Sequence, residues 1–297
     1  RNPADKTGSK IIPIFLLKRL FNIEGKTGRD YELGFTFSGI DIDSHFGRSV
    51  PPEKLYEVYG DKLEDAIKKN MDPHVVDYFL CTECEGRLSE IETLCSGTLN
   101  KTSKTDYKSG ISGLNGLLFW VSIFWRMSVN GKNGVKLSEN QNEILRSVLN
   151  AYLDNKPNDS VSKDSEYYES LKNISYKIIR CHDRRVEDST WLNFHPEFYD
   201  LMCFIIDEYV VVLSLDGNFD ELEKVDCFGI NDLLKNAPIN SYKTNETIKP
   251  LNREVYQNIV GRMSSIQLNL LKSDLDILLD EIHKRCGGKG EKMPMMI

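Results

Sequence analysis

Residues 114–129 are the most apolar stretch of the chain, and they restrict the folds that it can adopt. The segment LNGLLFWVSIFWRMSV is apolar around most of a helix, which is typical of a helix buried on several sides. It is too short to cross a bilayer and contains polar residues, so we expect a core helix and no association with a membrane. Five large side chains of this segment should be mostly buried: Phe119, Trp120, Ile123, Phe124 and Trp125.

Arg126 lies with Asn115 and Ser122 on the polar stripe of this helix. A guanidinium at such a position needs a carboxylate partner. Glu92 and Glu85 are the leading candidates for a structural ion pair. Binding of an anion or a phosphate group is the alternative.

The remaining patterns predict an α+β fold, mainly helical with a small antiparallel β-sheet. Helical periodicity is present in residues 51–70, 138–153 and about 250–286. The last of these carries one stripe of apolar residues: Ile266, Leu270, Leu271, Leu275, Leu278, Leu279 and Ile282. Segments rich in β-branched residues predict strands, and residues 201–215 should form two strands that turn at Asp207–Glu208.

A polar stretch without periodicity at residues 98–110 predicts a loop or a domain boundary. We therefore expect an N-terminal region over residues 1–108, and a helical domain with the small antiparallel sheet over residues 109–297.

Charge and cysteine content restrict the environment of the protein. The formal net charge of -7 and the pI of about 5.4 argue against a broad basic surface for nucleic acid, although a local patch remains compatible with them. The seven cysteines are an odd number and are scattered through apolar runs. This pattern favours reduced thiols and a cytoplasmic location.

Cys81 and Cys84 form a Cys-x-x-Cys pair, whose two thiolates have the separation that a tetrahedral zinc ion requires. Zinc needs two more ligands. The nearest candidates are His45, His74 and Cys95, and none of them has a recognised finger spacing. A zinc knuckle, two reduced structural cysteines and a redox pair are the three interpretations.

The helix that follows this pair places two carboxylates on one face. Glu85, Leu88, Glu92 and Cys95 are separated by steps of 3, 4 and 3 residues, so they share one side of a helix. Carboxylates on a partly buried face must be paired, hydrogen-bonded or bound to metal. Glu85 and Glu92 are therefore candidates for metal binding or acid–base catalysis, with salt bridges as the alternative.

The sequence CHDRR at residues 181–185 follows a predicted strand. It could form a small patch that contacts an anion or nucleic acid. A solvated strand end is the alternative interpretation.

Four segments together resemble bacterial proteins related to HNH (ββα-metal) nucleases, many of which occur near or within anti-phage defence systems. They are TGSKIIPIFLLKRL (7–20), YFLCTECEGRLSEIE (78–92), FWRMSV (124–129) and LSENQNEILRSVL (137–149). The resemblance implies a ββα-like N-terminal region, a structural Zn²⁺ held by two Cys-x-x-Cys pairs, and a catalytic Mg²⁺ or other divalent ion. It also implies a histidine general base, DNA or RNA as substrate, and a possible protein partner in a defence complex.

The chain departs from the family pattern at three points. Lys10 stands in the position of the histidine, Glu85 stands where asparagine or histidine is common, and the first cysteine pair is absent. We expect that pair upstream of Arg1 in a longer parent chain. A protonated lysine is a poor general base near neutral pH.

The resemblance thus assigns catalytic positions to Lys10 and Glu85, and the shared helix face adds Glu92 as a third catalytic candidate. The candidate metal ligands are Cys81, Cys84, His45 and His74. It predicts an HNH-like metal-dependent nuclease, or a protein derived from one that has lost activity. The alternative is a non-catalytic interaction or regulatory protein with a structural Cys-x-x-Cys turn.

Overall fold

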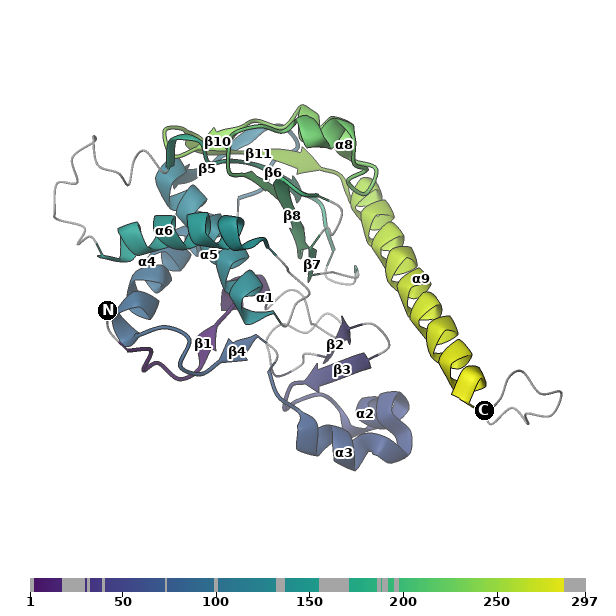
Figure 1. The fold of residues 1–297 in the computed structure, drawn as a ribbon. Helices are drawn as coiled ribbons and strands as arrows, with labels where there is room; N and C mark the ends of the chain where they lie inside the picture. Colours follow the sequence, from purple (N-terminus) through teal and green to yellow (C-terminus); the bar gives the residue numbers. More distant parts are fainter. Residues whose placement is uncertain are drawn as a thin grey trace.

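The computed structural model describes residues 3–17, 30, 33–38, 41–72, 74–98, 101–131, 137–154, 171–185, 188, 192–194 and 198–285. A mixed seven-stranded sheet with helices on both faces is its main feature (Figure 1). The strands of this sheet are β5 (Tyr107–Ser112), β6 (Ser175–Cys181), β7 (Leu192–Phe194), β8 (Leu201–Ile206), β9 (Tyr209–Ser214), β10 (Asn240–Ser241) and β11 (Asn245–Leu251).

Their order across the sheet is β5-β11-β6-β9-β8-β7, with β10 also paired to β6. Strands β11 and β6 run parallel, and the other described neighbours run antiparallel. The predicted α+β class is confirmed. The main sheet is larger than the small sheet that we expected, and one of its pairings is parallel.

Helices cover the two faces of the sheet unequally. The longer elements of the fold are α4 (Thr82–Thr98), α5 (Gly113–Asn130), α6 (Glu139–Asp154) and α9 (Arg253–Arg285), and the shorter ones are α1 (Ile14–Leu17), η3 (Asp220–Glu223) and α8 (Asn231–Lys235). One face packs on α4, α5 and α6, and the other on α8 and the first turns of α9. Because both faces are covered, every residue of β6, β8 and β9 is buried.

The predicted turn at Asp207–Glu208 is confirmed, since Ile206 pairs with Tyr209 across it. The backbone of Asp207 has a φ of 51°. Both acids are buried and pair with arginines on or just after β6. Asp207 pairs with Arg184 at 2.8 Å, and Glu208 pairs with Arg180. Ion pairing explains why two acids occupy a turn that more often carries Asn-Gly.

Helix α5 lies in the centre of the larger core. Phe119, Trp120, Ile123 and Phe124 are at most 1% exposed, as predicted. Trp125 is only partly buried and packs its ring against Phe79, with 5.4 Å between the centroids.

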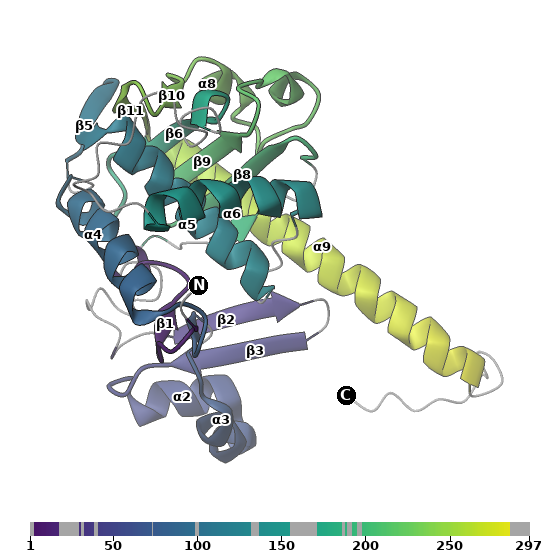
Figure 2. The same ribbon diagram turned by 60° about the vertical axis from the view of Figure 1, so that its left-hand side comes forward.

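The N-terminal elements form a smaller group beside the body of the molecule (Figure 2). They are β1 (Ser9–Lys10), β2 (Leu33–Ser38), β3 (Asp41–Phe46), α2 (Pro52–Tyr59), η2 (Gly60–Lys62), α3 (Leu63–Lys69) and β4 (Val75–Val76). Strands β2 and β3 form an antiparallel hairpin and are followed by α2. The helix predicted over residues 51–70 is divided at Gly60, whose φ is 51°.

Residues on both sides of position 108 share one core. Ile11, Leu17 and Leu88 belong to the same cluster of buried side chains as α5 and the sheet. Strand β5 also starts inside the loop predicted over residues 98–110, because alternate residues, Ser109 and Ile111, point inward.

Helix α9 leaves the body of the molecule after its first turns. Tyr256, Ile259 and Met263 are buried against the sheet. Beyond them the helix extends away from the other elements in both views (Figures 1 and 2). The predicted helix is confirmed, but most of its apolar stripe is exposed.

Candidate functional site

The N-terminal segment runs beside residues 74–80 and brings the predicted site residues together. Strand β1 pairs antiparallel with β4, with Lys10 opposite Val75. Backbone hydrogen bonds from Ile11 to His74 (3.0 Å) and from Lys6 to Leu80 (3.1 Å) continue the pairing in both directions. Lys10 is therefore fixed next to the residues that precede β4.

Two pairs of side chains lie there, Lys10 with Asp72 and His45 with His74, and we call these four residues the histidine cluster. The Lys10 Nζ lies 3.4 Å from Asp72 Oδ2, and Asp72 Oδ1 accepts the backbone N–H of His74 at 2.9 Å. The rings of His45 and His74 meet edge to face, with 6.0 Å between their centroids. Both histidines are buried, whereas Lys10 and Asp72 are about a quarter exposed.

Sequence reasoning selected three members of the histidine cluster and missed Asp72. A signal was present in the segment Asp72-Pro73-His74. An aspartate often accepts a hydrogen bond from the backbone N–H two residues later. Asp72 stands two residues before His74, so the sequence indicates a turn that fixes the Asp72 side chain beside the backbone of His74.

Arg126 is paired with Glu92, as predicted. Its Nη2 lies 2.8 Å from Glu92 Oε1, and its side chain is 1% exposed. The same guanidinium donates to the backbone oxygen of Lys10 at 2.9 Å and to Ser122 Oγ at 3.1 Å. Arg126 thus connects α4 and α5 with the backbone of Lys10 on β1, and Glu92 has a structural partner.

Cys81, Cys84 and Glu85 lie together at the start of α4. The Cys84 backbone N–H donates to Cys81 Sγ at 3.4 Å, so Cys81 caps the helix. Burial and the hydrogen bond with Cys81 raise the pKa of the Cys84 thiol to about 11, which argues against a redox thiolate. The Oε2 atom of Glu85 is buried and has no hydrogen-bond partner within the described ranges.

The predicted zinc ligands form two pairs in the structure. His45 meets His74, and Cys81 meets Cys84. Among the residues that the structure describes, no group of three or more His, Cys, Asp or Glu side chains could hold a metal ion. The described cysteine pair therefore supplies half of a tetrahedral set.

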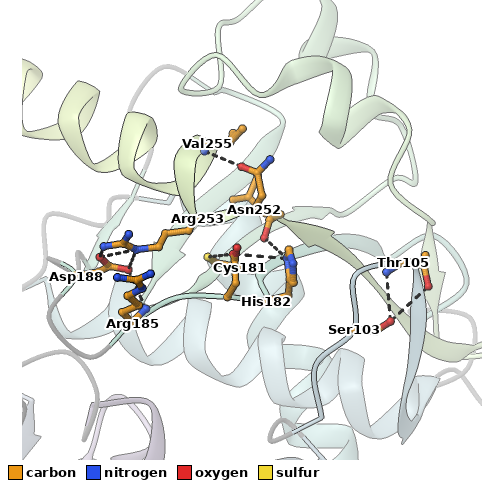
Figure 3. Close-up of polar contacts among 11 residues, drawn as sticks. Ser103, Thr105, Cys181, His182, Arg185, Asp188, Asn252, Arg253 and Val255 are labelled. Atoms are coloured by element: carbon orange, nitrogen blue, oxygen red, sulfur yellow. Dashed lines mark hydrogen bonds and ion pairs between the residues drawn. The ribbon is translucent and has the colours of Figure 1, made fainter.

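The segment after β6 is occupied by internal contacts (Figure 3). Arg253 Nε donates to both oxygens of Asp188, at 2.9 and 2.8 Å, and the Arg185 backbone N–H donates to the same carboxylate. These hydrogen bonds lower the pKa of Asp188 to about 2. His182 Nδ1 lies 2.8 Å from the backbone oxygen of Leu251, so that nitrogen carries the proton. These internal contacts support neither an open patch for an anion nor the solvated strand end that was the alternative.

A buried carboxylate in the main sheet was not predicted. Glu246 on β11 is fully buried and accepts Tyr176 Oη–H at 2.7 Å and Trp120 Nε1–H at 3.1 Å. Within the described ranges no basic side chain pairs with it, and burial raises its pKa. In the sequence Glu246 stands between Asn245 and Thr247, so nothing in its neighbours indicated that it would be buried.

This carboxyl group should make stability depend on pH. A folded-state pKa above the unfolded value means that folding favours the protonated form, so the stabilisation is complete below the unfolded pKa and is lost as pH rises through the folded one. We expect Glu246→Gln to remove this loss, so that the stability of the variant falls less than that of the parent as the pH is raised from 5 to 8. Urea unfolding at pH 5 and at pH 8 measures the free energy of unfolding of each protein. The exposed Glu143→Gln is the control, and equal pH slopes for parent and Glu246→Gln would contradict the assignment.

No family model, curated protein or solved structure matches the chain. Within the described part, no helix is both long enough and apolar enough to span a bilayer.

Proposed function

We propose that this chain is a protein derived from an HNH-type nuclease, in which Lys10 occupies the position of the general base. One observation carries the proposal. Lys10 pairs with Asp72, His45 meets His74, and the Asp72 carboxylate links the two pairs by accepting the backbone N–H of His74. Possible acids, bases and cations that distant segments bring to one place are the starting point for assigning a functional site.

The chemistry of the histidine cluster fits this role. Asp72 lies where it would orient a histidine at position 10 and stabilise its protonated form, as a carboxylate does in acid–base catalysis. A lysine ammonium has three donors and no acceptor, so it cannot take a proton from a water nucleophile. The nuclease activity should therefore be silent in the present sequence, and the cluster would bind a phosphate group of DNA or RNA through Lys10.

The cysteine pair supports the same proposal. Asp5 Oδ1 accepts the backbone N–H of Thr82 at 2.8 Å, so the N-terminal segment approaches Cys81 and Cys84. A structural Zn²⁺ would be held by these two thiolates, with further ligands from outside the described residues, and Mg²⁺ or another divalent ion would serve catalysis. The described cysteines are free thiols, which is consistent with a cytoplasmic protein.

Lys10→His is the test of this function. We expect the variant to nick supercoiled plasmid or cleave RNA in the presence of Mg²⁺ or Mn²⁺, while the parent stays inactive. The Lys10–Asp72 pair remains in contact with solvent and its two charged atoms are 3.4 Å apart, so we expect it to contribute only about 1 kcal/mol and the variant to fold. Cleavage should be abolished by EDTA and by the second substitution His74→Ala.

Lys108→His is the matched control, because Lys108 is an exposed lysine on β5. Activity in this control would point to a contaminating nuclease. A folded Lys10→His variant without cleavage of either substrate would contradict the proposal.

The alternative is a non-catalytic interaction protein, acting with a protein partner such as one in a defence complex. One observation favours it: the second half of α9 presents large apolar side chains to solvent. Surfaces of this kind mark interaction sites on soluble proteins.

A further inference from the structure

The exposed half of α9 carries a regular apolar seam. Leu268, Leu271, Leu275, Leu278 and Ile282 follow each other at steps of 3, 4, 3 and 4 residues. This is the heptad spacing of a coiled coil, with Leu268, Leu275 and Ile282 at a positions and Leu271 and Leu278 at d positions. We call these five residues the α9 seam.

Four of the five residues of the α9 seam are exposed in the single chain, and Leu271 is partly buried. Leu268 is 65% exposed, Leu275 49% and Ile282 39%. No other described element lies beside this half of the helix in either view (Figures 1 and 2). A helix in water depends mainly on packing of its apolar face, so this half requires a partner.

We propose that the partner is a second copy of this chain, which pairs through the α9 seam as a parallel, two-stranded coiled coil. In this alignment every seam residue meets its own counterpart, so all five layers are apolar. Leucine at both d positions and a β-branched residue at one a position, Ile282, are features of two-stranded coiled coils.

The charges beside the α9 seam favour the parallel arrangement. In the parallel arrangement each g position lies beside an e position of the other copy. Gln267 (g) then lies beside Lys272 (e), and Asp274 (g) beside Leu279 (e), so no like charges meet. Antiparallel alignments that retain four apolar layers bring Asp274 opposite Asp274 or Glu281 of the other copy. Such acidic pairs are destabilising.

The overall charge of the segment permits two copies to lie side by side. Residues 264–285 contain three Lys or Arg (Lys272, Lys284, Arg285) and four Asp or Glu (Asp274, Asp276, Asp280, Glu281), a net charge of -1 with histidine neutral. Repulsion between two such helices is therefore small despite the acidic total of the chain. The seam from Leu268 to Ile282 extends over roughly 21 Å of helix at about 1.5 Å per residue, which is four turns of paired contacts.

Two neighbouring residues provide a matched experiment. Leu278 lies on the α9 seam, whereas Ile277 is 56% exposed and lies off it. Light scattering coupled to size-exclusion chromatography should give about 68 kDa for the parent, twice the 34.1 kDa of one chain. Leu278→Asp should elute as a monomer, and Ile277→Asp should remain a dimer. Leu271→Asp is a second seam variant, and far-UV circular dichroism should show that the body stays folded in each protein.

The orientation is tested separately with Leu271→Cys. A parallel dimer places the two introduced thiols opposite each other, so mild oxidation should give a disulfide-linked dimer on a non-reducing gel, beyond the level in the parent. Parent protein that is monomeric at about 100 μM would overturn the proposal. Loss of the dimer in Ile277→Asp but not in Leu278→Asp would overturn the assigned seam, and a dimer without the Leu271→Cys cross-link would overturn the parallel arrangement.

Discussion

Gly113→Ala should lower the free energy of unfolding by about 3 kcal/mol or more, at or above the upper end of what overpacking usually costs. Gly113 is the first residue of α5 and packs on the turn between β10 and β11. A Cβ atom there would overlap the backbone oxygens of Ser241 and Thr244. These oxygens belong to a closed turn, in which Thr244 donates its N–H to Ser241 at 3.1 Å, so they cannot move independently.

Thermal unfolding followed by circular dichroism measures this effect. A loss of about 3 kcal/mol corresponds to a fall in Tm of roughly 6–12 °C for a domain of this size. Gly86→Ala in α4 is the control, because no atom lies within 4 Å of the Cβ position. Alanine is favoured over glycine in a helix by about 0.5–1 kcal/mol, so this control should be slightly stabilised. An unchanged Tm for Gly113→Ala would mean that α5 does not sit on the turn as described.

The sequence could not reveal this contact, although it predicted the helix. The limits of α5 were predicted almost to the residue from the apolar run of residues 114–129, and in the structure Gly131 closes the helix with a φ of 65°. The turn that it packs on lies more than a hundred residues away. Local patterns determine local structure, whereas pairing between distant segments depends on the whole chain.

Strand β11 shows the same limit within the sheet. Its sequence, NETIKPL, is largely polar and contains Pro250, which argues against a strand between two others. The structure nevertheless places β11 between β5 and β6. Its polar residues are accommodated individually: Thr247 exchanges two hydrogen bonds with Asn240, and Glu246 meets Trp120 and Tyr176.

The sequence identified most residues of the candidate site, but it did not predict which of them contact one another. Histidines, a lysine and carboxylates at suggestive positions identified Lys10, His45, His74 and Glu92. Their grouping depends on the pairing of β1 with β4, two strands of two residues each. Strands so short leave no periodic signal, so neither the role of Asp72 nor the separation of the histidines from the cysteine pair could be inferred.

The pairing of Arg126 with Glu92 predicts the second large effect. Arg126→Met should lower the free energy of unfolding by about 3–5 kcal/mol, because a partly buried carboxylate and the backbone oxygen of Lys10 lose their donor. Glu92→Gln should also destabilise the protein, by about 1–3 kcal/mol, since the guanidinium remains buried. The double variant should be less destabilised than the sum of the two singles, with a coupling energy of about 0.5–3 kcal/mol.

The matched control is the pair Arg146–Glu143 on α6, whose side chains are 40% and 58% exposed. Removing that pair should cost no more than about 0.5 kcal/mol, with no measurable coupling. Urea unfolding of the two sets of variants gives both coupling energies, and additivity at Arg126 and Glu92 would remove the assigned ion pair.

The Arg126→Met variant also tests whether the core positions the histidine cluster. Arg126 holds the backbone oxygen of Lys10, so its loss should loosen β1 before the rest of the molecule unfolds. Hydrogen exchange should then become faster at the Ile11 amide, which donates to His74, while the β8–β9 hairpin keeps its protection. Equal acceleration in both places would mean that Arg126 stabilises the protein as a whole and does not position Lys10.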